Sequence, residues 1–439
     1  MIERPVSEVP AGAWSRREFV GTAGAAAAAL TVAPAMMAAA GAQPVPGAAA
    51  RASDESFWRD VTAQFRIASP ITNLENGFWG VMARPVIDAY RDTIERVNAE
   101  GVQYVRGAYV RDLAAARARV AAVLGASVDE VAFTRGATEA MQILIGGYNR
   151  LAPGDAVLYA DLDYPGMQYA MKWLASRRGV RVARFVIPEP ATRRSVLDAY
   201  AAALDANKRV RMMLVTHCSH KTGLIFPVRE IIALARERGV DVLVDAAHSW
   251  GQIEMTVGGI DADFVGFTLQ KWIAAPVGLG ALYIRKSRLG AIDPMMGDED
   301  YSSGDILSRV HTGTVNFAAA LTAPAALDFH ERVGAANKAA RLRYLRDRWV
   351  NAVRPLAPVQ ILTPDDGEMA AGITSFRLNG GTSSEQNQRL IETLRDRYRI
   401  FTARRTGITR GDCVRITPSI YNSAADVDRL AAAIRELAG

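Results

Sequence analysis

Seven short apolar runs, most of them separated by helical segments, constrain the fold of this 439-residue chain more than any other feature. The runs are nearly continuous in apolar residues, which is typical of strands buried on both faces of a sheet. They lie at residues 131–134, 156–160, 181–187, 210–217, 241–245, 263–268 and 280–284. The helical segments between them lie at residues 138–148, 165–178, 195–205 and 228–238. This alternation predicts an α/β domain with a mostly parallel seven-stranded sheet flanked by helices, and ligands at the carboxyl ends of its strands.

The last run, at residues 280–285, follows the previous one too closely for a crossover helix, so we expect it to pair antiparallel. Before the sheet, residues 57–66 predict a short amphipathic helix, and residues 84–124 predict two helices, the first opened by Pro85.

The pattern changes again after residue 318, where a long arginine-rich helix is expected over residues 319–355. It leads to a smaller α+β unit with strands near 372–378, 399–403 and 412–417 and helices near 384–397 and 424–437. We therefore expect a linker and N-terminal segment at residues 43–80, a large domain at 81–318, and a small C-terminal domain at 319–439 that the N-terminal segment joins.

The first 42 residues resemble a secretory signal. Arg16 and Arg17 precede an apolar run over residues 21–40, and Ala40-Gly41-Ala42 offers a small-residue cleavage site. Paired arginines indicate the twin-arginine route, so its export machinery is an expected partner and the periplasm or the exterior the expected location. A disordered alanine-rich tail or a membrane anchor is the alternative, but Pro34 and the many small residues favour a signal over a permanent anchor.

The charge pattern argues against nucleic-acid binding. The net charge is +6, but the arginines are dispersed and often stand beside acids, as in residues 343–348, and no basic block is interleaved with aromatic residues. The two cysteines, Cys218 and Cys413, lie in apolar strand-like contexts and could form one disulfide or remain two buried thiols. No spacing of cysteine and histidine suggests a metal site.

A carboxylate and a lysine stand at the ends of successive strands. Asp245 closes the run at 241–245, and Lys271 follows the run at 263–268. Lysine is scarce here, with only six among 52 basic residues, and a desolvated lysine can form an imine whereas arginine cannot. An amine that binds an aldehyde, with an anion facing its ring nitrogen, is the arrangement that pyridoxal 5'-phosphate (PLP) requires. The alternatives are a surface lysine and an ion-paired or capping aspartate.

The turn at residues 133–140 predicts an anion site, because Gly136 precedes a helix whose free N–H groups at Ala137 and Thr138 would face a phosphate. A plain helix cap is the alternative. Four of the five histidines lie in segments expected to converge on the same sheet edge, which favours a functional role over a structural one: His217, His220, His248 and His311.

These segments, in this order, resemble the class V aminotransferases, which are fold-type I PLP-dependent enzymes, and especially their isopenicillin N epimerase-like branch. The resemblance covers about residues 55–438. It rests on Gly136-Ala137-Thr138-Glu139, on Asp245-Ala246-Ala247-His248, on Gln270-Lys271-Trp272 with the glycines that follow, and on residues 414–422.

The resemblance implies a role for each matching position. Lys271 would bind the cofactor covalently and move the α-proton, and Asp245 would pair with the pyridinium nitrogen. Tyr164 would stack on the cofactor ring, and Arg415 would bind the substrate carboxylate, a task that suits a guanidinium. Asn76 and Gly77 would line the substrate pocket.

The phosphate would be held by Ala137, Thr138, Thr268 and Gln270. Gly313 and Thr314 resemble the segment that reaches a phosphate across a dimer interface, so the family implies a homodimer with its active site at that interface.

Three positions depart from common family patterns: Tyr164 stands where many relatives have histidine, His220 where many have asparagine, and His248 where desulfurases have glutamine. His220 and His248 are therefore candidates for cofactor binding and for catalysis, because an added imidazole near the cofactor could tune its imine or move protons. No cysteine lies between Gly313 and Cys413, which argues against a desulfurase.

The hypothesis is a PLP-dependent enzyme that acts at Cα of an amino acid or peptide-like amine, by transamination or epimerisation. Export and family together suggest tailoring of a peptide siderophore or another secondary metabolite. The alternatives are a PLP-dependent oxidase or oxygenase, a C–S or β-elimination lyase, and a PLP-binding protein without turnover.

Overall fold

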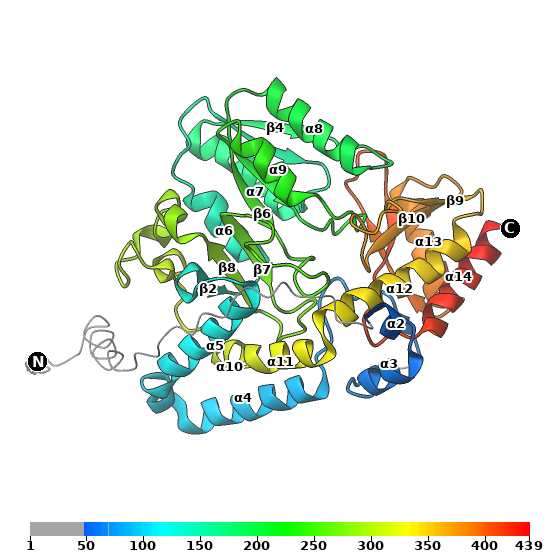
Figure 1. The fold of residues 1–439 in the computed structure, drawn as a ribbon, viewed down its shortest axis with the longest axis horizontal. Helices are drawn as coiled ribbons and strands as arrows, with labels where there is room; N and C mark the ends of the chain where they lie inside the picture. Colours follow the sequence, from blue (N-terminus) through cyan, green and yellow to red (C-terminus); the bar gives the residue numbers. More distant parts are fainter. Residues whose placement is uncertain (1–47, 69) are drawn as a thin grey trace, which may run out of the picture.

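The computed structural model describes residues 48–68 and 70–439, and Figure 1 shows them as a large α/β unit beside a smaller one. The expected signal at residues 1–42 and the first part of the linker lie outside the described residues. Across the described part of the chain, none of the helices combines the length and apolar character that a bilayer crossing requires.

The large unit is built on the expected seven-stranded sheet, with the strand order β2-β8-β7-β6-β5-β3-β4. Its strands are β2 (Val131–Thr134), β3 (Ala156–Ala160), β4 (Arg181–Phe185), β5 (Val210–Thr216), β6 (Asp241–Asp245), β7 (Phe264–Thr268) and β8 (Gly280–Ile284). The strands from β4 to β7 in this order run parallel, and β8 pairs antiparallel with both β7 and β2. The predicted α/β fold and the antiparallel last strand are thus confirmed.

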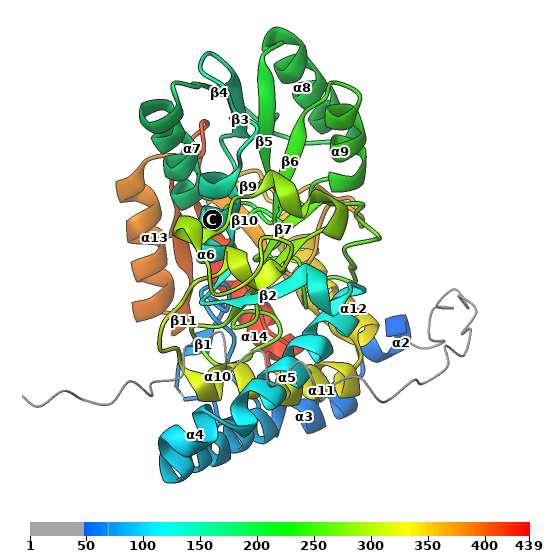
Figure 2. The same ribbon diagram turned by 90° about the vertical axis from the view of Figure 1, so that its left-hand side faces the viewer.

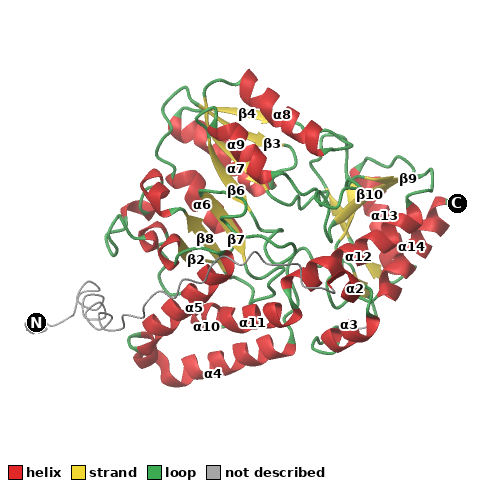
Figure 3. Cartoon of the chain, in the orientation of Figure 1, coloured by secondary structure: helices red, strands yellow, loops and turns green. Residues whose placement is uncertain are grey.

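Helices cover both faces of this sheet, which explains why its strands are apolar throughout (Figure 3). One face packs on α6 (Ala137–Gly147) and α7 (Pro165–Arg178), where Leu243 and Phe264 enter the shared core. The opposite face packs on α5 (Ala108–Leu124), α8 (Arg193–Ala206) and α9 (Val228–Arg236), together with the alternate residues Val244 and Val265.

The long helix predicted over residues 319–355 is wrong, because three helices occupy this stretch. They are α10 (Phe317–Leu321), α11 (Ala323–Val333) and α12 (Ala335–Val353). Pro324 lies in the first turn of α11, where its missing N–H costs nothing, and therefore marks a helix start and not a helix interior. Gly334 separates the next two helices with a φ of +89°, which only glycine adopts readily. Figure 1 shows α10 and α11 lying against α4 (Arg84–Val105), while α12 continues to the small unit.

The small unit is a four-stranded antiparallel sheet with the order β12-β13-β10-β9. Its strands are β9 (Val359–Ile361), β10 (Thr374–Leu378), β12 (Ala403–Arg405) and β13 (Cys413–Ile416). The helices α12, α13 (Ser384–Asp396) and α14 (Ala424–Ala438) supply the rest of its core. Two details differ from expectation: β9 was not predicted, and the strand expected at 399–403 divides between β12 and β11 (Ile400–Phe401).

The N-terminal segment contacts both units. In the rotated view of Figure 2, its strand β1 (Thr72–Asn73) lies beside β11. These two strands pair in parallel, and Glu75 then forms a parallel bridge with Thr417. Farther along, the Gly80 N–H donates to the carbonyl of Gln270 at 2.7 Å. A Cβ at Gly80 would lie 2.0 Å from the Lys271 carbonyl oxygen, so this close approach requires glycine.

Candidate active site

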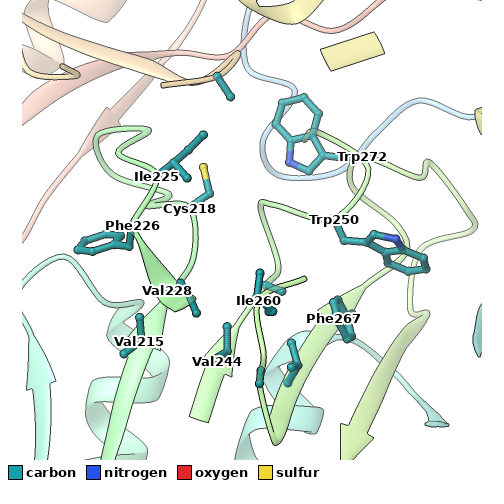
Figure 4. Close-up of a cluster of buried hydrophobic side chains, with 14 of the residues drawn as sticks. Val215, Cys218, Ile225, Phe226, Val228, Val244, Trp250, Ile260, Phe267 and Trp272 are labelled. Carbon is teal, nitrogen blue, oxygen red and sulfur yellow. The ribbon is translucent and has the colours of Figure 1, made fainter. Parts of the chain in front are cut away.

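The candidate site lies where β5, β6 and β7 end side by side. Thr216 at the end of β5 is the register partner of Asp245, which in turn pairs with Gly266 of β7. Figure 4 shows the strand residues Val215, Val244 and Phe267 in the core, with Cys218 and Trp272 on the loops that follow the strands. Loops from three adjacent parallel strands therefore meet at one edge, which is the expected place for a ligand.

Lys271 lies in the loop that joins β7 to β8. Its Nζ is 2.9 Å from Nε2 of His248, which follows β6. Burial, together with the charges of Arg415 and Arg405, lowers the pKa of Lys271 to about 8, although the charges of Asp245 and Glu75 oppose the change. An amine with this pKa is partly neutral near pH 7, as nucleophilic attack on an aldehyde requires.

Asp245 is the last residue of β6 and is 4% exposed. Its Oδ1 accepts a hydrogen bond from the Ala247 N–H at 2.9 Å. Burial raises the pKa of this carboxyl, and the positive charge of Lys271 acts against the rise. A buried carboxylate without a cationic hydrogen-bond partner is costly, so a protonated ring nitrogen would complete this site.

Three aromatic or imidazole rings line the site beside Lys271. The rings of His220 and His248 are stacked with centroids 6.5 Å apart and an interplanar angle of 23°. Tyr164, which is 41% exposed, meets His220 edge-on at 5.2 Å. Burial holds the pKa of both histidines well below the usual value, so both are neutral. Their buried Nδ1 atoms have no hydrogen-bond partner within the described residues, which leaves them available to a ligand.

The other two histidines of the expected cluster behave differently. His217 is buried, and burial lowers its pKa to about 4, so it is a neutral residue at the end of β5. The Nδ1 of His311 lies 2.9 Å from Asp298 instead of among the rings beside Lys271. Gly313 and Thr314, which follow His311, are exposed on this single chain.

The backbone at the expected phosphate site leaves N–H groups free for an anion. Helix α6 begins after Gly136 without a side-chain cap, which leaves its first N–H groups, at Ala137 and Thr138, for an anion. Gly280 of β8 packs directly on this turn, since a Cβ there would lie 2.4 Å from the Gly136 Cα.

The lysine loop supplies the other expected phosphate ligands. The hydroxyl of Thr268 is 3.5 Å from the Leu279 carbonyl, and Gln270 Oε1 accepts from the Gly278 N–H at 2.6 Å. The helix start and the lysine loop are therefore held together, in keeping with a cofactor that carries a phosphate at one end.

Arg415 lies in β13 and is 1% exposed. Its Nη1 donates to the His220 carbonyl at 2.7 Å, and its Nη2 pairs with Oε1 of Glu75. Arg405 of β12 binds the same carboxylate oxygen at 2.7 Å. Gly77 lies against this group, because a Cβ there would be 2.4 Å from Nη2 of Arg415. The sequence reasoning missed Glu75 and Arg405, which only the approach of distant segments brings to the site.

Asn76 is buried in a hydrogen-bond network of its own. Its amide donates to the Asn73 and Thr417 carbonyls, and its Oδ1 accepts from Asn73 and Tyr421. Asn76 therefore has a structural role, because it holds the N-terminal segment on the small unit. Its expected role in lining the substrate pocket stays a prediction.

The two cysteines, which could have been paired, are buried free thiols. Burial raises the pKa of Cys218 to about 12 and that of Cys413 to about 11. Both therefore remain protonated and poorly nucleophilic.

Comparisons with known proteins agree with this geometry. The model of the aminotransferase class-V family matches residues 81–430. The isopenicillin N epimerase of Streptomyces clavuligerus is 27% identical over 399 residues, which are 87% of this chain and 98% of that protein. Among solved structures, the apo cysteine desulfurase of Thermococcus onnurineus NA1 has a TM-score of 0.73 at 22% identity, covering 86% of this chain and 97% of the other. A C-DES mutant with glycine covalently linked to its PLP cofactor has a TM-score of 0.74 at 22% identity, covering 85% and 98%. The chain therefore belongs to the aminotransferase class-V family, and its cofactor is PLP.

Proposed function

We propose that this protein acts at the Cα–H bond of an amine or amino acid, by transamination or epimerisation. The observation that carries the proposal is the Lys271 amine, which lies 2.9 Å from Nε2 of His248, has its pKa lowered to about 8 and feels the charge of the buried Asp245. PLP, when bound, supplies an electron sink that acidifies the Cα–H bond of a substrate amine.

Each residue of the site then has a defined task. Asp245 holds the proton on the cofactor ring nitrogen, and Lys271 accepts the Cα proton at Nζ and returns it. His248 orients that Nζ through the 2.9 Å contact. His220 is neutral and close to His248, so its unpartnered Nδ1 can hold the cofactor hydroxyl or a substrate group. Return of the proton to the opposite face of Cα would give epimerisation, whereas release of a keto product would mark transamination.

Elimination at a C–S bond is the second candidate, because similar folds include the cystine C–S lyase C-DES. A desulfurase that passes sulfur to its own cysteine is disfavoured, since both thiols are buried and held protonated. A lyase that releases its sulfur product directly needs no such thiol, and volatile sulfide from cysteine would identify it.

Location and assembly form part of the proposal. The leader at residues 1–42 supports twin-arginine export to the periplasm, where a peptide siderophore or another secondary metabolite is a plausible substrate class. The exposed Gly313 and Thr314 support a homodimer in which each chain reaches the partner's phosphate site. N-terminal sequencing of the exported protein and its mass in solution test these two points.

The decisive experiment is borohydride reduction of the purified holoprotein, followed by peptide mapping. We expect the cofactor to be found on Lys271 and to be lost in Lys271→Ala, with the exposed Lys172→Ala as the matched control. A reduced cofactor on any other lysine refutes the assignment. An amine screen that follows the keto product, the Cα configuration, oxygen and peroxide then separates transamination, epimerisation and oxidation.

A further inference from the structure

The arginine expected to bind a substrate carboxylate already holds a carboxylate of the chain itself. Glu75 Oε1 pairs with Nη2 of Arg415, and Arg405 donates to the same oxygen at 2.7 Å. The arrangement is buried: the side chains of Glu75, Arg405 and Arg415 are 9%, 23% and 1% exposed. A substrate carboxylate that approaches Arg415 therefore finds its Nη2 already paired with Glu75.

The backbone fixes Glu75 in this place from both sides. The Thr417 N–H donates to the Leu74 carbonyl at 2.7 Å, and the Asn76 N–H donates to the Thr417 carbonyl at 3.1 Å. The Glu75 N–H is held by Oδ1 of Asn73 at 2.9 Å. Gly77 leaves the room that the Arg415 guanidinium fills. Glu75 is thus a built part of the site and not a surface side chain that happens to fold inward.

The charges of this group leave it incomplete. One carboxylate lies between two guanidinium groups, so the group carries a net positive charge. Burial acts to raise the pKa of Glu75, but Arg415 and Arg405 outweigh it and hold the pKa below the usual value, so Glu75 stays ionised. Its Oε2 and the Nε of each arginine are buried without hydrogen-bond partners among the described residues. The two unpartnered Nε–H groups are donors that an added anion could satisfy, and a buried donor without a partner is costly.

We propose that Glu75 is an internal competitor for Arg415: a ligand carboxylate gains the arginine only by displacing it, and the enzyme therefore favours amines without a free carboxylate on the reacting carbon over the matching α-amino acids. This inference deepens the proposed function, on which its substrate class rests. Glu75 is here a specificity-determining residue that acts through Arg415 and does not touch the reacting atoms.

The first test measures carboxylate binding without turnover. Propionate is titrated into the cofactor-free protein and into Glu75→Gln, which keeps the shape and one acceptor but removes the charge. We expect the Kd for propionate to fall about tenfold in Glu75→Gln, which corresponds to about 1.4 kcal/mol. Adding Arg415→Lys to that variant should abolish the gain. An unchanged or weaker affinity in Glu75→Gln means that Glu75 supports the arginine, and overturns the proposal.

A second buried pair of glutamate and arginine provides a matched control. Glu189 pairs with Arg377, which is 2% exposed, and neither residue contacts Lys271, Glu75 or Arg415 in any hydrogen bond or ion pair of the described residues. Glu189→Gln should leave propionate binding unchanged, so an equal gain there would assign the effect to general charge and refute the competitor role. If Glu75→Gln does not fold, Glu75→Asp retracts the carboxylate by one methylene and should show a smaller gain in the same direction.

The second test addresses the substrate class in the holoprotein. The cofactor absorption is titrated with phenylalanine and with 2-phenylethylamine, which differ only in the carboxylate. Wild type should bind the amine more tightly, and Glu75→Gln should shift the ratio about tenfold toward the amino acid. A ratio that does not move contradicts the inference. If the cofactor were not on Lys271, the proposed function would fail while the propionate result would still stand.

Discussion

The lowered pKa of Lys271 leads to a quantitative prediction about its reactivity. With a pKa of about 8 in place of 10.5, about one tenth of the amine is neutral at pH 7, against roughly 0.03% for an ordinary lysine. The difference is about 300-fold in the reactive form. Reductive methylation of Lys271 in the cofactor-free protein, followed by peptide mapping, should therefore rise about tenfold per pH unit below pH 8 and level off above it.

Asp245→Asn is the perturbation that tests the cause. The negative charge of Asp245 raises the pKa of Lys271, so its removal should move the midpoint of the labelling profile below pH 8. The exposed Lys172 in the same digest controls for the reagent. A wild-type profile that keeps rising to pH 10, or a midpoint that moves upward in Asp245→Asn, refutes the electrostatic account of the site.

Two further predictions concern stability. Burial lowers the pKa of Lys338 to about 7, so the unfolded chain holds more protons between pH 7 and 10.5, and stability should rise with pH across this window. Lys338→Met should therefore be more stable than wild type at pH 6 by about 4 kcal/mol. This is the cost of about 5 kcal/mol for the lowered pKa, less about 1 kcal/mol for the lost bond to the Trp272 carbonyl. Urea unfolding should show the gap in stability closing toward pH 10, and a gap independent of pH contradicts this. Gly223→Ala should cost more than about 3 kcal/mol, because its Cβ would lie 2.0 Å from the Ile373 carbonyl at a φ of +75°, whereas Gly239→Ala, with φ +66° and open space, should cost about 1 kcal/mol. Equal losses in the two glycine variants, measured by urea unfolding, would show that backbone strain and not the clash decides.

The sequence predicted the large sheet well because its strands are buried on both faces. Such strands are continuous apolar runs, and Asp245 and Lys271 stand out where the runs end. The helix pattern over residues 319–355 misled, since apolar spacing continues across Thr322 and Gly334 while the backbone turns. Local sequence patterns do not indicate the direction in which the chain continues after a helix ends.

The arginine group was the harder part to predict. Arg415 could be proposed from its motif, but its partner Glu75 is 340 residues away in the sequence. Nothing in the sequence near Glu75 indicates that it is buried or ion-paired, because the residues that bury it belong to strands near the C-terminus. The motif that contains Arg415 is therefore readable from the sequence, whereas the partners of this arginine depend on the tertiary contacts.

The N-terminal segment also dictates when the site can form. Residues 72–80 are synthesised early, but their partners at residues 400–417 come at the far end of the chain. A nascent chain that has completed the large sheet still has no Glu75–Arg415 pair and no anchor for Asn76. Contacts of such long range are slow to form. Ribosome-bound or C-terminally truncated chains can therefore hold Lys271 on a finished sheet, yet selection among carboxylates begins only after release of the full chain.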